Sequence, residues 1–252
     1  MALTTLITQL ERVINDRKIK TAVFFLSKIN SIKKRYLQSN PADEEQVNKL
    51  IPNFKIKPLA VLREEVAKKI IEYKKIRKEA EERVAELASQ KIMRGSVVFV
   101  YGNSQIINKA LKLASDKGIN FVVYTIDSGF SLEGRKAADE ISKANIPVKH
   151  FPDILTSEAL SKADILFFEP KAITKDGKII TQMGINNILS EAKKKKVFSY
   201  CIFNTEKLAR MQPGKTNPYE IKNYAVFVKE RNEIVKLSNI TAIINEHGII
   251  KP

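Results

Sequence analysis

The chain has 252 residues, of which 44% are apolar, and a formal net charge of +16. This length supports one large domain or two small ones with a sizeable core, and the apolar fraction argues against a disordered chain. No apolar run approaches the roughly 18–20 residues of a membrane-spanning helix, and the first residues lack the pattern of a secretion signal. We therefore expect no membrane association.

The cysteine and histidine content limits the chemistry further. The single cysteine, Cys201, rules out a disulfide framework within one chain and a cysteine-rich zinc site. The two histidines, His150 and His247, lie far apart in the sequence and leave little from which to build a metal site. We expect no metal and no other cofactor, and a reducing, cytoplasmic location.

The positive charge is spread along the chain. Residues 1–94 hold 21 Lys and Arg against 12 Asp and Glu, and residues 95–252 hold 23 against 16. A basic balance is typical of proteins with an anionic partner such as nucleic acid, the ribosome or a phosphate ligand. The alternative, a solvated Lys- and Glu-rich surface, is favoured because the chain has no RNP-like aromatic pattern and no GxxG loop. A nucleic-acid partner therefore rests on charge alone.

Residues 1–92 show helical patterns and no convincing strand. Apolar residues between positions 62 and 87 recur at steps of three and four, which predicts one long amphipathic helix with a single buried stripe. Pairs such as Glu64 and Lys68 lie four residues apart on its polar face. Prolines at positions 41 and 52 interrupt the stretch before it. We predict a helical N-terminal domain over residues 1–92 that packs on the remainder of the chain.

From residue 93 to residue 252 the pattern changes to short apolar strands that alternate with helices. The predicted strands lie at residues 96–101, 120–124, from 146 onward, 164–168 and 197–203. One predicted helix follows the first strand and ends at residue 117. Three others lie at residues 131–144, 156–162 and 184–194. This alternation predicts an α/β domain whose parallel sheet is covered by helices on both faces.

Ligands of such sheets bind in the loops that follow the carboxyl ends of the strands. Here these are the loops after Tyr101, Tyr124, Phe168 and Phe203. Residues 103–104 (Asn-Ser) would lie at a strand-to-helix turn, where backbone N–H groups and a helix N-terminus attract anions. A simple helix N-cap explains the same pair equally well, and the sequence leaves both interpretations open.

The motifs in and between these loops resemble one family. Five segments match in order, namely 125–135 (TIDSGFSLEGR) to ESRP-x-x-EGR, 144–148 (ANIPV) to xGIPV, 162–166 (KADIL) to KADLV, 175–184 (KDGKIITQMG) to xDGxVxNKxG, and 240–252 (ITAIINEHGIIKP) to ITAIITExGVIxP. The chain is therefore identified as similar to the translation initiation factor 2B α, β and δ subunits and the related methylthioribose-1-phosphate and ribose-1,5-bisphosphate isomerases. The resemblance implies an N-terminal helical domain, a Rossmann-like C-terminal domain and dimers formed through the latter, often assembled further.

The resemblance also locates the isomerase chemistry, which needs a thiol and a carboxyl group across the sugar. The cysteine position, after the first strand, corresponds to Gly102, and the aspartate position, after the fourth strand, corresponds to Lys171. Glu169 stands two residues before Lys171 and is a candidate compensating acid. We interpret Cys201, which lies within the fifth predicted strand, as a small core residue.

Further positions of the isomerase site have changed. The Asn-Lys pair after the DGxV turn corresponds to Thr181 and Gln182, and the arginine of ESRP corresponds to Gly129. A lysine after the fifth strand is retained as Lys207. These substitutions predict a non-catalytic protein. The predicted ligand-binding residues are Gly102, Asn103, Ser104, Glu169, Lys171 and Lys207, which we expect to line a polar, cationic pocket.

Our hypothesis is a non-catalytic initiation factor 2B-like regulatory or binding subunit that acts on initiation factor 2 or senses a phosphate-bearing small ligand. The alternative is a diverged sugar-phosphate isomerase that uses Glu169. Apolar runs at residues 224–228, 234–237 and 240–252 exceed what a five-stranded sheet needs. They predict a homodimer or larger assembly through the C-terminal domain.

Overall fold

The computed structural model describes residues 3–39, 43–129, 132–173, 177–205 and 232–252, and by their backbone alone residues 209–210, 219–222 and 225–228. Two units of the chain each have a core of their own. The first consists mainly of Met1–Glu79 and the second mainly of Ala80–Leu208 and Pro213–Pro252. None of the helices in the described ranges is both long and apolar enough to span a bilayer.

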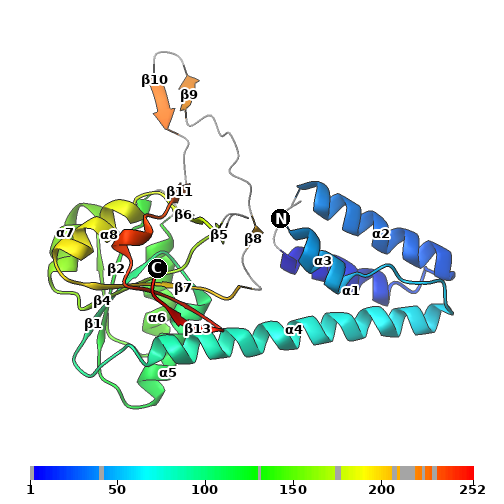
Figure 1. The fold of residues 1–252 in the computed structure, drawn as a ribbon, viewed down its shortest axis with the longest axis horizontal. Helices are drawn as coiled ribbons and strands as arrows, with labels where there is room; N and C mark the ends of the chain where they lie inside the picture. The colour runs from blue at the N-terminus through cyan, green and yellow to red at the C-terminus, as the bar shows by residue number, and fades with distance from the viewer. Residues whose placement is uncertain are drawn as a thin grey trace. The chain divides into compact units, whose positions relative to one another are not determined.

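The N-terminal unit is built from helices (Figure 1). They are α1 (Leu3–Asn15), α2 (Ala22–Ser39), α3 (Glu44–Leu50) and the first part of α4 (Leu59–Ser89). Apolar residues at helical spacing bury Leu6 and Leu10 of α1 against Phe25 and Ile29 of α2, all with no exposed surface. The stripe on α4 supplies Leu62 and further apolar residues to the same core.

Arg63 of α4 fastens the connection between α1 and α2. Its guanidinium donates hydrogen bonds to the backbone carbonyls of Ile14, Asp16 and Ile19, at 2.7 Å to Asp16 and 3.1 Å to Ile19. The same group lies 5.7 Å from the ring centre of Phe25. The last carbonyls of a helix have no partner within the helix, so this side chain satisfies groups that the end of α1 leaves free.

The C-terminal unit contains a seven-stranded sheet in the order β13-β12-β7-β4-β1-β2-β3. All neighbouring pairs are parallel except β12 and β13. The strands are β1 (Val97–Tyr101), β2 (Val122–Ile126), β3 (Val148–Phe151), β4 (Ile165–Phe168), β7 (Phe198–Ile202), β12 (Ala242–Asn245) and β13 (Gly248–Ile250).

Helices cover both faces of this sheet, so the central strands are buried on both sides. The end of α4 packs on one face together with α5 (Gln105–Asp116) and α6 (Glu133–Lys143), against Val98 and Val100 of β1. On the other face α7 (Thr156–Ser161) and α8 (Ile185–Lys194) pack against Phe99. Because successive residues of β1 are buried on opposite faces of the sheet, the strand is a continuous apolar run in the sequence.

Smaller elements lie outside the main sheet. Strands β5, β6 and β11 pair antiparallel in the order β11-β6-β5, and β9 and β10 form a separate antiparallel pair. The bounds of these elements are β5 (Ala172–Ile173), β6 (Ile179–Gln182), β8 (Ala209–Arg210), β9 (Tyr219–Lys222), β10 (Ala225–Val228), β11 (Asn232–Ile234), and the short 3₁₀ turns η3 (Asp153–Leu155) and η4 (Leu237–Asn239).

The predicted fold class, a helical N-terminal part followed by a Rossmann-like parallel sheet, is confirmed. Element ends differ by one or two residues from the sequence pattern, as at β2, which begins at Val122 rather than at residue 120. The expected five-stranded sheet has seven strands, because β12 and β13 of the segment 240–252 join its edge rather than lying outside it. The two units divide within α4, which continues from one into the other. The predicted boundary between residues 92 and 93 stays a prediction of domain organisation.

Replacing Arg63 tests the link between the helices of the N-terminal unit. We expect Arg63→Ala to lower the free energy of unfolding by about 1–3 kcal/mol, because hydrogen bonds from a charged group are lost and partly buried carbonyls stay unsatisfied. Urea denaturation measures the change. Lys75→Ala on the same helix removes only an exposed pair with Glu79 and should change stability by less than about 0.5 kcal/mol. Equal losses would contradict the assigned role of Arg63.

Candidate functional site

A cavity of about 200 Å³ lies at the carboxyl edge of the main sheet. It is formed by the end of β1, the start of α6, the segment after β4 and strand β6. Its lining residues are Tyr101, Gly102, Asn103, Glu133, Glu169, Pro170, Lys171, Thr181 and Gln182. The position agrees with the rule that open α/β sheets bind ligands beyond the ends of their strands.

Four of the six residues proposed from sequence line this cavity, namely Gly102, Asn103, Glu169 and Lys171. Ser104 does not, because its side chain is buried and its hydroxyl accepts a hydrogen bond from the Ile107 N–H at 3.2 Å. It serves as the N-cap of α5. Lys207 lies outside the described residues.

The main-chain conformation at Gly102 is unusual for a catalytic position. Its φ is +80°, in the left-handed region that favours glycine, and its N–H donates to the Ser128 hydroxyl at 3.2 Å. A Cβ added here would lie 3.6 Å from a carboxylate oxygen of Glu133. An L-residue with a side chain at this position would therefore be strained, whatever space surrounds it.

The loop after β2 is held against the cavity by several polar contacts. The Asp153 carboxylate accepts hydrogen bonds from the N–H groups of Ser128 and Gly129 at 2.9 and 2.8 Å. The Ser128 carbonyl accepts a bond from the Gln182 side-chain amide at 2.5 Å. Ser128 itself has φ +64°, a strained value for a residue with a side chain. These contacts join β2, β3 and β6 around one site.

Gly134 lets α6 begin directly against the end of β2. A Cβ added to it would lie 1.6 Å from the carbonyl oxygen of Ile126, a main-chain atom at the end of β2. No side chain larger than hydrogen fits there unless the helix or the strand moves. The position of Glu133, the preceding residue in the cavity wall, follows from this contact.

Sequence reasoning missed the wall that the β5–β6 pair contributes. Thr181 and Gln182 were considered only as replacements of a family motif, and Glu133 was not proposed as a site residue. The composition of residues 175–178 is typical of a turn. Its placement depends on long-range contacts, such as the bond between the amide of Gln182 and the carbonyl of Ser128.

The charges in the cavity differ from the expectation. Its described lining carries two carboxylates, Glu133 and Glu169, against the single ammonium group of Lys171. The expected cationic character is therefore not found among the described residues. Their lining is polar but mixed in sign, which suits a ligand with both hydroxyl and phosphate groups.

Cys201 does not take part in the cavity. It lies in β7 with no exposed surface, and burial raises the pKa of its thiol well above the ordinary value. A thiol of this kind stays protonated near neutral pH and is a poor nucleophile. Among the described residues, no group of three or more His, Cys, Asp and Glu side chains is arranged to hold a metal ion.

A second polar cluster stands beside the loop after β2. The Asp127 carboxylate accepts a hydrogen bond from Arg135 at 2.6 Å and lies 3.1 Å from a ring nitrogen of His150. The other ring nitrogen of His150 lies 2.8 Å from the Thr125 hydroxyl. The hydrogen bond from Arg135, and then that from His150, holds the pKa of Asp127 below its usual range.

The chain combines a Rossmann-like domain, with a polar cavity at the carboxyl edge of its sheet, and a helical unit. The chain belongs to the initiation factor 2 subunit family, whose model matches residues 2–252. The resemblance found in the sequence motifs is therefore confirmed.

Two characterised relatives represent different activities. The chain is 30% identical over 141 residues to translation initiation factor eIF2B subunit alpha of Dictyostelium discoideum. The aligned region covers 56% of this chain and 43% of the relative. It is 23% identical over 187 residues to ribose 1,5-bisphosphate isomerase of Pyrococcus furiosus. That aligned region covers 68% of this chain and 58% of the relative. The chain thus spans about half the length of these relatives.

Solved structures confirm the fold. The translation initiation factor eIF-2B of Pyrococcus horikoshii OT3 matches with a TM-score of 0.79 and 18% identity, over 100% of this chain and 92% of its own. The 5-methylthioribose 1-phosphate isomerase of the same organism matches with a TM-score of 0.81 and 14% identity, over 98% and 78%. At these identities the likeness concerns the fold, which a binding protein and an enzyme share.

Gly134→Ala tests the close backbone contact under the cavity. We expect it to lower the free energy of unfolding by about 3 kcal/mol or more, because the added Cβ overlaps the Ile126 carbonyl and forces α6 away from β2. Urea denaturation measures the loss. Gly118→Ala is the matched control, since its φ is +74° with nothing within 4 Å, and should cost only about 1–2 kcal/mol. Similar losses for both variants would argue against the contact.

The pH dependence of stability tests the Asp127 cluster. The pKa of Asp127 is lowered in the folded state, so its contribution is fully present above the unfolded value near 3.8 and is lost as pH falls through the lower folded pKa. Asp127→Asn should therefore lower the melting temperature at pH 7, and the difference should shrink at pH 3. Asp139→Asn, at an exposed pair with Lys143, should have a much smaller effect at pH 7. A difference that persists unchanged at pH 3 would refute the linkage.

Proposed function

We propose that the chain is a non-catalytic, initiation factor 2B-like subunit that binds a phosphate-bearing small ligand in the cavity around Gly102. The observation that carries this proposal is the conformation of Gly102 at the position of the isomerase cysteine. Its φ of +80° disfavours any residue with a side chain. The site therefore differs from the isomerase pattern in its backbone conformation as well as in the residue type. A cysteine at this position would strain the backbone of the loop after β1.

The second proton-transfer position supports the same conclusion. Lys171, which corresponds to the isomerase aspartate, lies in the same cavity as Gly102. An ammonium group there cannot replace a carboxylate that accepts a proton and returns it. Cys201 is buried in β7 with a raised pKa, so it does not supply the missing thiolate.

The polar groups that remain suit binding. Lys171 offers an ammonium group for a phosphate, and Asn103 offers an amide. Glu133 and Glu169 line the same cavity and can accept hydrogen bonds from sugar hydroxyls. A sugar phosphate or a nucleotide combines these two kinds of group, which is why we propose this ligand class.

The relatives support a role in translation initiation. One characterised relative is a translation initiation factor eIF2B subunit alpha, and one similar structure is the tetrameric eIF2B-beta2-delta2 complex from C. thermophilum. We therefore propose that this chain acts in the cytoplasm, assembles through its C-terminal domain into a homodimer or larger assembly, and has initiation factor 2 as its partner.

A diverged sugar-phosphate isomerase is the second candidate. Two carboxylates, Glu133 and Glu169, line the cavity and are the acids that such an enzyme would use. The isomerase relative from Pyrococcus furiosus keeps this alternative open. Turnover distinguishes it from the binding function.

Thermal melts with ligands test the proposed binding. We expect ribose 1,5-bisphosphate, methylthioribose 1-phosphate or a nucleoside monophosphate to raise the melting temperature, because a ligand at 100 times its Kd stabilises the folded state by about 2.7 kcal/mol. Lys171→Ala should remove the shift. Lys162→Ala, at an exposed pair with Glu158, should keep it. The absence of any shift with all three ligand classes would refute ligand binding.

A turnover assay tests the absence of catalysis. We expect no conversion of either sugar phosphate above the buffer rate, because each missing proton-transfer group typically costs about 10²–10⁴-fold in rate. Mass spectrometry or a coupled assay of the ketose product measures it. Conversion that disappears in Glu169→Gln would overturn the non-catalytic assignment and support the isomerase.

Light scattering tests the proposed assembly. Ile250, on the edge strand β13, has 47% of its surface exposed and is a candidate for the contact between copies. We expect at least a dimer at micromolar concentration, which Ile250→Lys weakens without unfolding the chain. Ile56→Lys, at a 73% exposed position in the N-terminal unit, should leave the mass unchanged. A monomer mass that persists as concentration rises would contradict the assembly.

A further inference from the structure

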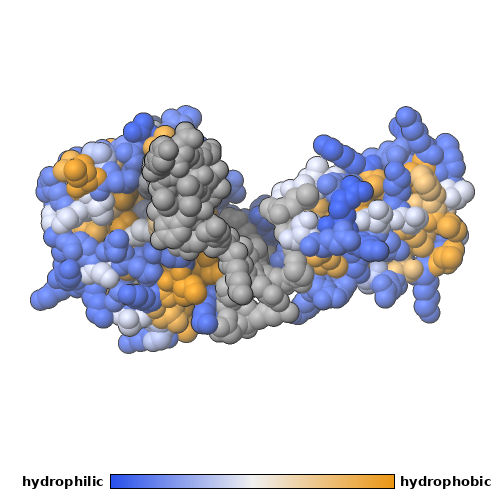
Figure 2. Space-filling view, turned by 90° about the horizontal axis from the view of Figure 1, so that it is seen from above, coloured by the Kyte–Doolittle hydropathy of each residue, from blue (hydrophilic) through white to orange (hydrophobic). Residues whose placement is uncertain are grey.

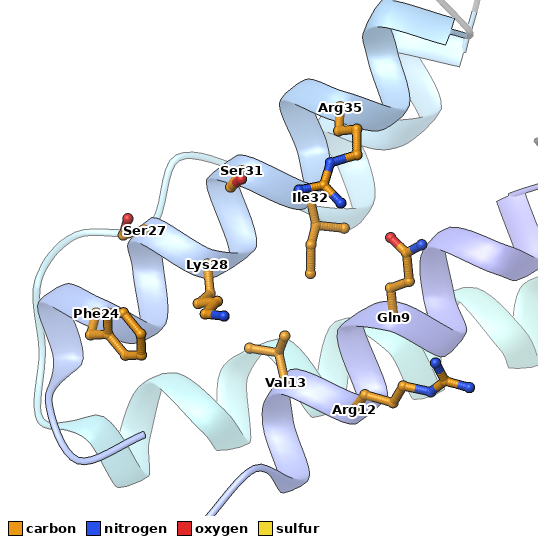
Figure 3. Close-up of a pocket in the computed structure, with 9 residues that line it drawn as sticks. All are labelled: Gln9, Arg12, Val13, Phe24, Ser27, Lys28, Ser31, Ile32 and Arg35. Carbon is orange, nitrogen blue, oxygen red and sulfur yellow. The ribbon is translucent and has the colours of Figure 1, made fainter. Parts of the chain in front are cut away.

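A groove between α1 and α2 is a second concave site, complete within the N-terminal unit. Its volume is about 430 Å³, and Figure 3 shows the side chains of both helices that line it. Lys28 and Arg35 extend from α2 toward the gap, and Gln9 and Val13 face it from α1. Arg12 lies at the edge of the groove, with its side chain directed away from α2. None of these residues belongs to the cavity around Gly102, so the groove needs a separate explanation.

The groove is positively charged without compensation. Arg12, Lys28 and Arg35 are among its lining residues, and none of the described residues that line it is acidic. Helix α2 carries four basic residues and no acidic one in its 18 positions. Among the described residues, none of the three lining cations forms an ion pair within 4.0 Å. An anion would therefore meet cations whose charge no carboxylate neutralises.

A neighbouring groove in the same unit shows the contrast. The site formed by residues 52–57 and α4 is also rich in lysine, but acids line it as well. Lys57 pairs with Glu65, and Lys69 pairs with Glu72 at 3.0 Å. On the face drawn in Figure 2 the coloured surface is predominantly hydrophilic, with separate hydrophobic patches. A surface lysine is thus ordinary here, whereas three cations around one groove without an acid are not.

The groove also has an aromatic platform in line with its cations. Phe24 is 50% exposed, and the ammonium group of Lys28 lies 5.5 Å from its ring centre. Phe24, Lys28 and Arg35 follow one another along α2 at intervals of four and seven residues, over about 16 Å of helix. Ser27 and Ser31 are among the residues that line the same groove.

We propose that this groove binds single-stranded RNA. Proteins that hold a single strand combine cations that follow the sugar–phosphate backbone with exposed aromatic rings on which bases stack. Arg12, Lys28 and Arg35 supply the cations, and Phe24 supplies the ring. Ser27 and Ser31 are also among the lining residues, and a serine hydroxyl can bond to a ribose 2′-hydroxyl. The resulting contact reads the backbone and is tolerant of base sequence.

The distribution of the cations favours RNA over a phosphorylated peptide. Recognition of one phosphoryl group uses arginines gathered around a single point. Lys28 and Arg35 are separated by about 10 Å along the helix, a spacing that serves successive phosphates of a strand. An exposed phenylalanine next to the first cation has no function in binding one phosphate, but it stacks on a base.

The test measures binding of a fluorescent 12-nucleotide oligouridylate to the full chain by anisotropy. We expect a Kd of about 10 μM or tighter at 50 mM salt, and a slope of log K against log salt near about −2, since each single-strand phosphate contact contributes about −0.7. The triple variant Arg12→Ala, Lys28→Ala, Arg35→Ala should weaken binding at least about tenfold and flatten this slope. Phe24→Ala should weaken binding about five- to tenfold with the slope unchanged.

A charge-matched variant provides the control. Lys57→Ala, Lys69→Ala, Lys75→Ala removes the same charge from the same unit, but from lysines paired with acids, and should leave RNA binding within about twofold. The same sequence as DNA is the second arm. If RNA binds more tightly than DNA, the difference shows contacts to the ribose 2′-hydroxyls. If RNA and DNA bind equally, the protein contacts only the sugar–phosphate backbone and the bases. Either result supports binding in the groove.

Three results would overturn the proposal. These are no binding at 50 mM salt, equal weakening by the two triple variants, or a phosphoserine peptide that binds through the groove cations while RNA does not. Melting temperatures of all variants show whether the fold is retained, which we expect because the three cations and Phe24 are at least partly exposed.

Discussion

The cavity of the C-terminal unit depends on one close contact between two backbones. Gly134, in the first turn of α6, lies so near the carbonyl of Ile126 at the end of β2 that a Cβ would stand 1.6 Å from its oxygen. Because the helix starts there, Glu133 stands in the cavity wall. The return of the chain also leaves Ser128 at a positive φ, with its hydroxyl accepting from Gly102 and its carbonyl accepting from Gln182. These hydrogen bonds stabilise the strained backbone conformation that the tight turn requires at Ser128.

The same scaffold serves binding and catalysis among proteins of this fold, and the difference lies in a few loop positions. In this chain the position after β1 is a glycine in the left-handed region, and the position after β4 is a lysine. Carboxylates remain in the cavity, but no described thiol faces it, since Cys201 is buried in β7. On the proposed assignment, the cavity keeps hydrogen-bonding groups for a polar ligand and lacks the thiol and carboxyl pair of the isomerase chemistry.

The two units present different kinds of concave surface. The C-terminal cavity is small and mixed in charge, with Glu133 and Glu169 beside Lys171. The groove of the N-terminal unit is larger and lined by three cations with no acid. The net charge of +16 is therefore not spread evenly over the two concave sites. Many surface lysines pair with acids at exposed positions, where such pairs contribute little to stability, whereas the α1–α2 groove retains uncompensated charge.

The amino-acid pattern by itself determined the class of the fold and the residue types at the candidate site. Apolar spacing over α4 and continuous apolar runs at β1 and β4 depend on local periodicity, so the helix and the buried strands follow from sequence. Gly102 and Lys171 were assigned from motifs. Only the tertiary structure decided that Ser104 turns inward as a helix cap, that Gln182 joins the cavity across 54 residues to Ser128, and that Arg12 and Arg35 share one groove. Local periodicity specifies which face of an element is buried, but the convergence of distant loops depends on long-range packing, which has no local sequence signal.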